Sequence, residues 1–194
     1  MKRIIIGISG ASGAIYGIRA LQILKEIPDI ESHLVLSGAS HLTIELETDW
    51  KVSQVRDLAS ASYSDNQIGA RIASGSFQTD GMLIAPCSIK TLSAVANSYA
   101  DNLLVRAADV QLKEGRPVVL MVRETPLHPG HLRLMALAAD NGAVIFPPVP
   151  AFYGNPHSLD EMVSNTVGRA LSRLGVENPD YPRWEGGISG VEGD

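Results

Sequence analysis

The sequence predicts an α/β fold: a single-domain, Rossmann-like (flavodoxin-like) parallel sheet with helices on both faces. The chain opens with an apolar run that leads through a loop of Gly, Ala and Ser into a segment of helical period. Short apolar runs and helical segments then alternate, which is typical of a parallel sheet covered on both sides. With 194 residues, 45% of them hydrophobic, the chain can form one sizeable core. We expect one domain over 1–177 and a partly irregular tail over 178–194.

Five apolar runs predict the strands, starting with the unbroken run from Ile4 to Ile8. They place strands near residues 3–8, 33–37, 81–85, 117–122 and 143–146. Each run is short and bounded by polar, Gly or Pro residues, as expected for strands buried on both faces.

Six segments of helical period predict the helices. They lie near residues 13–26, 38–47, 88–99, 102–115, 129–141 and 158–174. In the first, Ile15, Ile18 and Leu21 repeat at spacing three and mark a buried stripe, while Arg19 is expected to face water. Residues 48–80 are more polar and lack a clean period, so they are expected to form short helices, a lid or a contact between copies.

Charge and cysteine content narrow the class of partner and the compartment. A net charge of −5 argues against nucleic acid or an anionic membrane as the main partner. The single cysteine excludes an internal disulfide and suits a reducing compartment. No signal peptide is recognisable, and no apolar run reaches the roughly 20 residues of a membrane span. We expect a cytoplasmic protein.

The loop after the first strand has the residues of a phosphate cradle. Gly10 and Gly13 let the backbone turn and approach a ligand, and Ser12 puts a hydroxyl near the start of a helix, where anions are favoured. The glycines do not follow G-x-G-x-x-G, and the second strand ends in Ser37 rather than an acidic residue. This pattern favours a mononucleotide such as FMN over NAD; a tight turn with no ligand is the alternative.

In open α/β sheets, ligands bind beyond the carboxyl ends of the strands, so the residues that follow each strand matter most. Ser88 and Thr91, after the third predicted strand, can donate to a phosphate or simply cap their helix. Cys87 would need an activating base or cation to act as a nucleophile, and small buried cysteines are common. Tyr153 lies in a proline-rich loop after the fifth strand, where its hydroxyl could meet a phosphate or its ring could pack the loop.

Charged residues supply candidates for binding an anion. Arg123 and Glu124 directly follow the fourth predicted strand, where Glu124 could exchange a proton with a substrate oxygen, or the two could form a structural ion pair. Arg106 and Lys113 lie seven residues apart on one helix face with Asp109 between them, which also fits a solvated face with salt bridges.

Two other kinds of site are rejected. His128 and His131 form the one close histidine pair, but their spacing is not the helical H-E-x-x-H pattern and no cysteine lies near them in the sequence, so no metal site is expected. The Ser12 loop is not a G-x-S-x-G elbow, which argues against a Ser–His–Asp triad.

Several motifs in the same order closely resemble the UbiX/Pad family of flavin prenyltransferases, which have an HFCD-related fold. These motifs are Gly10–Gly13, Ser37, Glu45–Asp49, Pro86–Ser88, Arg106–Asp109, Leu112–Glu114, Arg116–Pro117, Arg123–Leu127 and Pro148–Tyr153. The resemblance covers nearly the whole chain.

The resemblance implies a metal-independent enzyme that joins a dimethylallyl group, from dimethylallyl monophosphate, to N5 and C6 of reduced FMN. Its product, prenylated FMN, would serve a UbiD-type decarboxylase in quinone synthesis or aromatic acid breakdown. By matching motifs, FMN would be held by Gly10, Ala11, Ser12, Ser37, Ser88, Ile89, Lys90, Thr91 and Arg123. The prenyl phosphate would be held by Arg106, Lys113, Arg123, Tyr153 and Arg169. Ser12 and Glu47 would manage the proton at the flavin nitrogen.

The residue types suit this chemistry. Departure of phosphate from an allylic carbon builds negative charge that Arg and Lys stabilise, and Glu124 would protonate the leaving oxygen. Aromatic faces stabilise an allyl cation, and Trp184 is the candidate for that wall.

The chain departs from the family at two places. Gly38 follows Ser37 where many relatives carry Lys, and the stretch 63–76 lacks the tryptophan that some relatives place in the prenyl pocket. Family members form large homo-oligomers, in the resemblance dodecamers, with sites at subunit contacts.

Two other functions remain open. One is an FMN-dependent decarboxylase of the phosphopantothenoylcysteine decarboxylase-like group, for which His41 is the supporting residue. The other is a non-catalytic carrier of FMN, which would not need the cations and Glu124 together.

Overall fold

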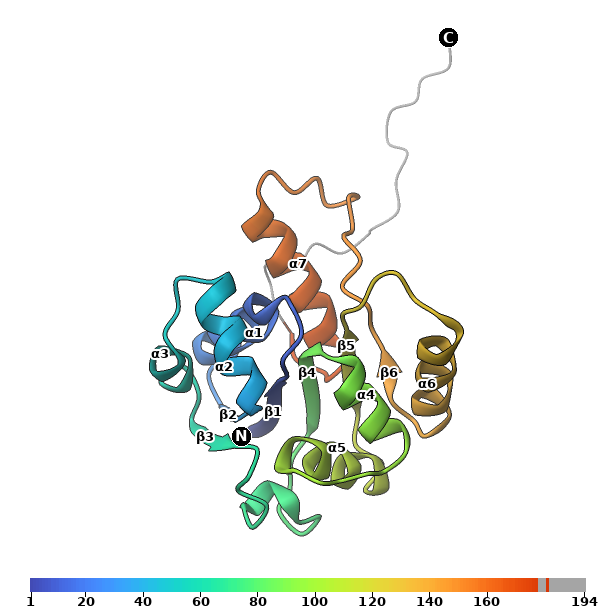
Figure 1. Ribbon diagram of the computed structural model, residues 1–194. Coiled ribbons are helices and arrows are strands. Elements are labelled where there is room, and N and C mark those ends of the chain that lie inside the picture. Colours follow the sequence, from blue (N-terminus) through green and yellow to red (C-terminus); the bar gives the residue numbers. More distant parts are fainter. Residues whose placement is uncertain (178–180, 182–194) are drawn as a thin grey trace.

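The computed structural model describes residues 1–177 and residue 181, and it contains a six-stranded parallel sheet in the order β3-β2-β1-β4-β5-β6. The strands are β1 (Lys2–Ile8), β2 (Ile30–Leu36), β3 (Ala61–Ser64), β4 (Gly81–Cys87), β5 (Val118–Val122) and β6 (Val144–Ile145). The helices are α1 (Ala14–Glu26), α2 (Gly38–Glu47), α3 (Val52–Arg56), α4 (Ile89–Ala96), α5 (Leu103–Lys113), α6 (Pro129–Asp140) and α7 (Leu159–Ser172), with a 3-10 turn at Arg71–Ala73. Figure 1 shows the sheet between helical layers, so the predicted fold class is confirmed.

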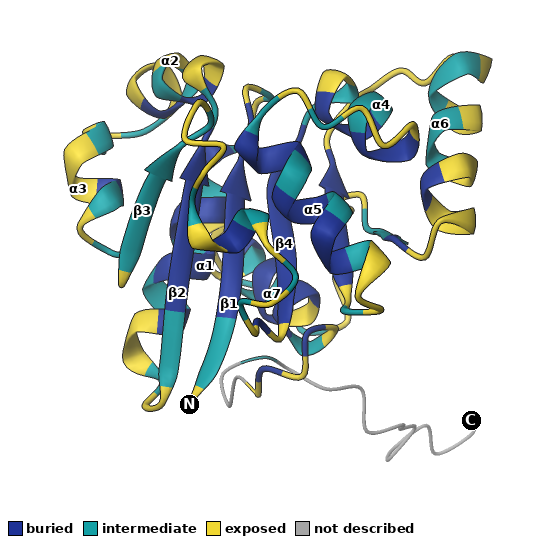
Figure 2. Ribbon diagram, turned by 90° about the horizontal axis from the view of Figure 1, so that it is seen from below, coloured by how far each residue is buried: buried dark blue, intermediate teal, exposed yellow. Residues whose placement is uncertain are grey.

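The central strand β1 explains how the two faces are covered. Successive side chains of a strand point to opposite faces, so Ile4, Ile6 and Ile8 pack in the cluster that includes α1 and α7. Ile5 packs in the other cluster, with residues of α4, α5 and α6. Because both faces are covered, β1 and β4 are apolar along most of their length, and Figure 2 shows these strands as largely buried.

The strand Ala61–Ser64 was not predicted. Its sequence, Ala-Ser-Tyr-Ser, has no apolar run, and all four residues are only half-buried. It pairs with β2 alone at the edge of the sheet, where backbone hydrogen bonds are enough to form a strand. The second strand also begins earlier than predicted, at Ile30, because its first three residues, Ile-Glu-Ser, do not form an apolar run.

The first helix packs more closely than its sequence pattern suggests. Besides Ile18 and Leu21, its small residues are buried, and a Cβ on Gly17 would lie 2.3 Å from the carbonyl oxygen of Ala85 in β4. Arg19 was expected to face water, but its guanidinium donates to Ser164 Oγ at 2.9 Å and pairs with Asp160 on α7. The glycine therefore sets the distance between helix and sheet, and the arginine joins two helices.

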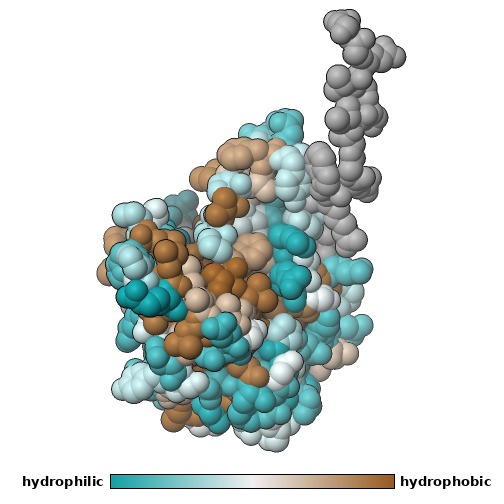
Figure 3. Space-filling model, turned by 90° about the vertical axis from the view of Figure 1, so that its right-hand side faces the viewer, coloured by the Kyte–Doolittle hydropathy of each residue, from teal (hydrophilic) through white to brown (hydrophobic). Residues whose placement is uncertain are grey.

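Figure 3 shows apolar side chains gathered on the face of the molecule that carries α6 and the segments after β5 and β6. The exposed apolar residues of these segments include Leu127, Leu132, Leu137, Val149 and Phe152. None of the helices in the described part of the chain combines the length and the apolar character that a membrane span requires.

His33 is a buried titratable group in the middle of β2. Its Nδ1 lies 3.2 Å from the hydroxyl of Tyr63, and its Nε2 lies 3.2 Å from a carboxylate oxygen of Glu31. Burial lowers the pKa of His33, and the nearby Glu31 carboxylate opposes that shift only in part. The imidazole is therefore held neutral in the folded state to a lower pH than in the unfolded chain.

This shift predicts a loss of stability in mild acid. Below about pH 6.5 the unfolded chain takes up a proton at His33 that the folded chain does not, so the free energy of unfolding decreases as the pH falls toward the lower folded pKa. Urea unfolding at about pH 7.5 and about pH 5.5 measures the drop. His33→Gln should show a smaller drop than the wild type, whereas His157→Gln, which alters an exposed histidine, should not. Equal pH dependence in the wild type and His33→Gln would contradict the prediction.

Candidate active site

The loops after β1 and β4 are tied together by Ser9. Its side chain is buried, its hydroxyl donates to the carbonyl oxygen of Pro86 at 2.8 Å, and its Oγ accepts from the backbone N–H of Ser88 at 2.8 Å. The backbone N–H of Ser9 also donates to the Pro86 carbonyl, at 3.2 Å. Ser9 was not among the predicted site residues, although a hydroxyl directly after an apolar strand was the available signal.

In the loop after β1, Gly10 and Gly13 are each required for a different structural reason. A Cβ on Gly10 would lie 2.4 Å from the Cβ of Ala39, so only glycine lets this loop lie against the first turn of α2. Gly13 has a φ of 97°, which favours glycine, and it is the residue that precedes α1. These positions bring the backbone of the loop to the end of the sheet.

Glu47 and Ser12 meet at the same loop. Glu47 is the last residue of α2, and its Oε2 accepts a hydrogen bond of 2.7 Å from the backbone N–H of Gly13. Ser12 is exposed, and no side chain caps the N-terminus of α1, so its hydroxyl is not used as a helix cap. The Glu47 carboxylate thus lies beside Gly13, the residue that follows Ser12 in the chain.

A cavity of about 230 Å³ lies between the starts of α2 and α4. Ser37 caps α2 by accepting from the N–H of Ser40 at 3.2 Å, and Ser88 caps α4 by accepting from the N–H of Thr91 at 3.3 Å. Among the lining residues are Gly10, Ser37, Ser88, Lys90 and Thr91, all of them predicted cofactor ligands.

The donor set of this cavity fits a phosphate-bearing ligand such as FMN. Two helix N-termini carry partial positive charge, Lys90 adds a full one, and the Cβ-free Gly10 leaves room at the wall. Asp65, which the sequence analysis did not single out, also lines the cavity and accepts from the N–H of Gly38 at 3.2 Å. Ala11, Ser12 and Arg123 belong to the adjoining loops and Ile89 is the first residue of α4, but these four residues do not line this cavity.

Arg123 and Glu124 follow β5 at the same edge of the sheet. The backbone N–H of Arg123 donates to the Cys87 carbonyl at 3.0 Å, which fixes the start of this segment against β4. Burial raises the pKa of Tyr16 in the first turn of α1, and the Arg123 guanidinium opposes that shift. Glu124 is exposed and accepts from the N–H of Thr125 at 3.0 Å.

Tyr153 and Arg169 lie together at a second, smaller cavity of about 50 Å³, between α7 and the segment after β6. Tyr181 also lines it, and this tyrosine was not among the predicted site residues. The predicted aromatic wall, Trp184, lies outside the described residues.

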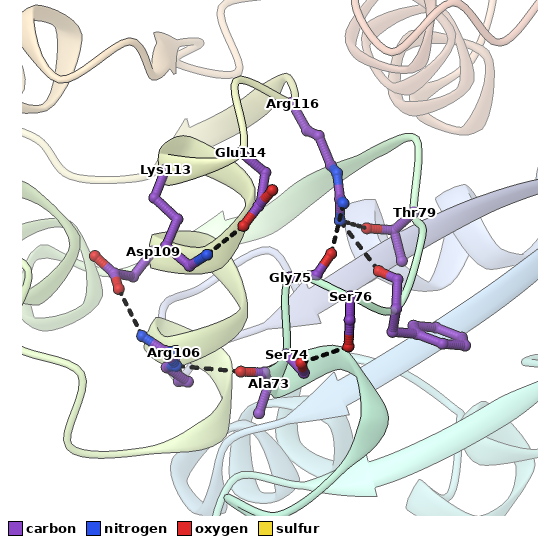
Figure 4. Close-up of polar contacts among 11 residues, drawn as sticks. Ala73, Ser74, Gly75, Ser76, Thr79, Arg106, Asp109, Lys113, Glu114 and Arg116 are labelled. Carbon is purple, nitrogen blue, oxygen red and sulfur yellow. Dashed lines mark hydrogen bonds and ion pairs between the residues drawn. The ribbon is translucent and has the colours of Figure 1, made fainter.

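Figure 4 shows the polar contacts of Arg106 and Lys113, which both belong to α5. The Arg106 guanidinium donates to the Ala73 carbonyl at 3.2 Å and pairs with Asp109 at 2.9 Å. Lys113, at the end of α5, pairs with Glu114. It lies beside Gly75, in the segment that leads into the amino end of β4, so a single chain does not bring Lys113 to the cavities at the carboxyl ends of the strands.

The structure does not favour a nucleophilic role for Cys87 or a metal site at His128 and His131. Cys87 is fully buried, and burial raises the pKa of its thiol, which disfavours a nucleophilic thiolate. The rings of His128 and His131 are tilted by 33° with centroids 3.6 Å apart, and no cluster of three metal-binding side chains includes them within the described residues.

Comparison with known proteins identifies the family of this chain. The model of the family described as Flavoprotein matches residues 1–169. The flavin prenyltransferase UbiX of Escherichia coli K12 is 58% identical over 188 residues, which is 96% of this chain and 100% of that protein.

Two solved structures are similar over nearly their full length. The crystal structure of AnUbiX (PadA1) in complex with FMN and dimethylallyl pyrophosphate has a TM-score of 0.93 and 44% identity, covering 96% of this chain and 99% of that one. The dodecameric FMN-dependent UbiX-like decarboxylase from Escherichia coli O157:H7 has a TM-score of 0.92 and 46% identity, covering 95% and 100%. Because these matches extend over nearly the whole chain, the protein belongs to the Flavoprotein family and, within it, to the flavin prenyltransferases of the UbiX type.

Proposed function

We propose that this chain is a flavin prenyltransferase that joins a dimethylallyl group from dimethylallyl monophosphate to N5 and C6 of reduced FMN, without a metal, and releases phosphate. The observation that carries the proposal is the cavity between the hydroxyl-capped starts of α2 and α4, with Gly10 at its wall. The product, prenylated FMN, would pass to a UbiD-type decarboxylase. We place the reaction in the cytoplasm, since a reducing compartment keeps the flavin in its reduced form.

FMN is held in this proposal by the two helix starts and the adjoining loops. The residues are Gly10, Ala11, Ser12, Ser37, Ser88, Ile89, Lys90, Thr91 and Arg123. Reduced FMN, when bound, supplies the ring atoms to which the prenyl group is joined. Ser12 and Glu47 handle a proton at this loop: Glu47 is held by the Gly13 N–H, so its second oxygen can accept a proton that the Ser12 hydroxyl passes on.

The donor phosphate is bound by cations and hydroxyls at the second cavity. Tyr153 and Arg169 line it, and Arg123 and Glu124 lie at the same edge of the sheet. Negative charge grows on the phosphate as the allylic C–O bond breaks, so the guanidinium groups stabilise the transition state more than the ground state. Glu124 then gives its proton to the leaving oxygen, and Trp184 shields the allyl cation.

Arg106 and Lys113 complete the site from another copy of the chain in a homo-oligomer. Within one chain they lie beside the segment that precedes β4, away from Tyr153 and Arg169. The exposed apolar residues around α6 provide a surface suited to burial between copies. A relative of 46% identity is dodecameric, and we propose the same assembly here.

The FMN-dependent decarboxylase and the FMN carrier are not favoured. His41 is a residue of α2 and is not part of the lining of either cavity described above. The Escherichia coli K12 relative that is 58% identical over 96% of this chain is named a flavin prenyltransferase.

The mass of the flavin after turnover tests the function. Protein incubated without oxygen with reduced FMN and dimethylallyl monophosphate should release phosphate and give a flavin heavier by one dimethylallyl group. Dimethylallyl pyrophosphate in a parallel reaction establishes which form of the donor is used. A flavin of unchanged mass with both donors would contradict the proposal.

Glu124→Gln tests the proton donor. The amide cannot give a proton to the leaving oxygen, so turnover should fall by about 10²- to 10⁴-fold. FMN affinity, followed by flavin fluorescence, should stay within about twofold, since the change is nearly isosteric and Glu124 does not line the cavity between α2 and α4. Glu26→Gln, on the exposed end of α1, is the matched control. Full activity of Glu124→Gln would remove Glu124 from the mechanism.

Co-expression of two inactive variants tests the shared site. Glu47→Gln keeps Lys113, and Lys113→Ala keeps Glu47. If Lys113 acts on a neighbouring chain, mixed oligomers contain intact sites, about a quarter of the total for random assembly. Each variant alone should be nearly inactive. Mixed oligomers no more active than the separate variants would show that Lys113 acts within its own chain or not at all.

A further inference from the structure

The smaller cavity is lined by a residue from beyond the last helix. Tyr181 lies 28 residues after Tyr153 in the sequence, and both line the cavity together with Arg169 of α7. Tyr181 falls within the segment that the sequence analysis assigned to the C-terminal tail. The wall of the candidate phosphate site therefore extends past the predicted end of the domain.

The two tyrosines are joined through their hydroxyl groups. The oxygen atoms lie 3.1 Å apart, and either hydroxyl can be the donor. Tyr153 is 50% exposed, so packing alone restricts its ring only in part. A hydrogen bond at the tip of the ring fixes the position of the hydroxyl, and a phenol that accepts a hydrogen bond is a better donor to a further oxygen.

We propose that Tyr181 is a positioning residue for Tyr153: its hydroxyl holds the Tyr153 hydroxyl beside Arg169, so that the two side chains form a preformed receptor for a phosphate monoester. The proposal rests on the proposed function for the identity of that monoester as the prenyl donor. Tyr181 acts through Tyr153, and removal of its hydroxyl should therefore weaken binding of the donor while leaving the chemical step intact.

Tyr181→Phe removes the hydroxyl and keeps the ring. At saturating reduced FMN, its KM for dimethylallyl monophosphate should rise about 3- to 10-fold, the range expected for one net hydrogen bond, with kcat within about twofold. Tyr153→Phe should raise KM at least as much. The double variant should match Tyr153→Phe alone, because Tyr181 has no effect without the hydroxyl that it positions.

Calorimetry gives the Kd of inorganic phosphate and so tests anion binding at the cavity without turnover. Tyr181→Phe should raise its Kd by a similar factor, and Tyr99→Phe, an exposed tyrosine outside this cavity, should not. Thermal melting checks that every variant is folded. The proposal is overturned if KM and the phosphate Kd of Tyr181→Phe equal those of the wild type, if the two substitutions act additively, or if the wild type binds no phosphate at millimolar concentrations. A wild type that binds phosphate but forms no prenylated flavin contradicts the proposed function alone.

Discussion

The candidate site depends on the buried hydroxyl of Ser9. Parallel strands bring their carboxyl ends to one edge of a sheet, but they do not determine how the loops beyond that edge lie against one another. Ser9 provides this link, since its Oγ both donates to the Pro86 carbonyl and accepts from the Ser88 N–H. Its burial removes competing water, so both bonds are made in an environment where an unpaired polar group would be costly.

The cavity gains its chemical character from backbone rather than from many charged side chains. The capped starts of α2 and α4 both face it, and Gly10 can lie there only because it has no Cβ. This arrangement explains how a chain of net charge −5 can offer a site for an anion. The favourable field comes from aligned peptide dipoles and Lys90, and the rest of the surface can stay acidic.

The apolar pattern was enough to predict the sheet and most of its helices, because buried strands and amphipathic helices leave a periodic signal. It was not enough for β3, whose Ala-Ser-Tyr-Ser sequence forms an edge strand through backbone pairing. At the site, the motifs predicted the residues of the cavity such as Ser37 and Ser88. Contacts between residues distant in the chain, such as Tyr153 with Tyr181, leave no periodic trace and needed the structure.

The carboxylate of Asp65 makes the two ends of the cavity between α2 and α4 electrostatically different. Its hydrogen bond to the Gly38 N–H already satisfies one of the free donors at the start of α2 and places a negative charge there. An incoming anion is thus repelled from that end and attracted to the start of α4, beside Lys90. A ligand with one anionic and one neutral end consequently has a single favoured orientation in the cavity. The Asp65 carboxylate can accept hydrogen bonds from hydroxyl groups of the neutral part, but it repels a phosphate.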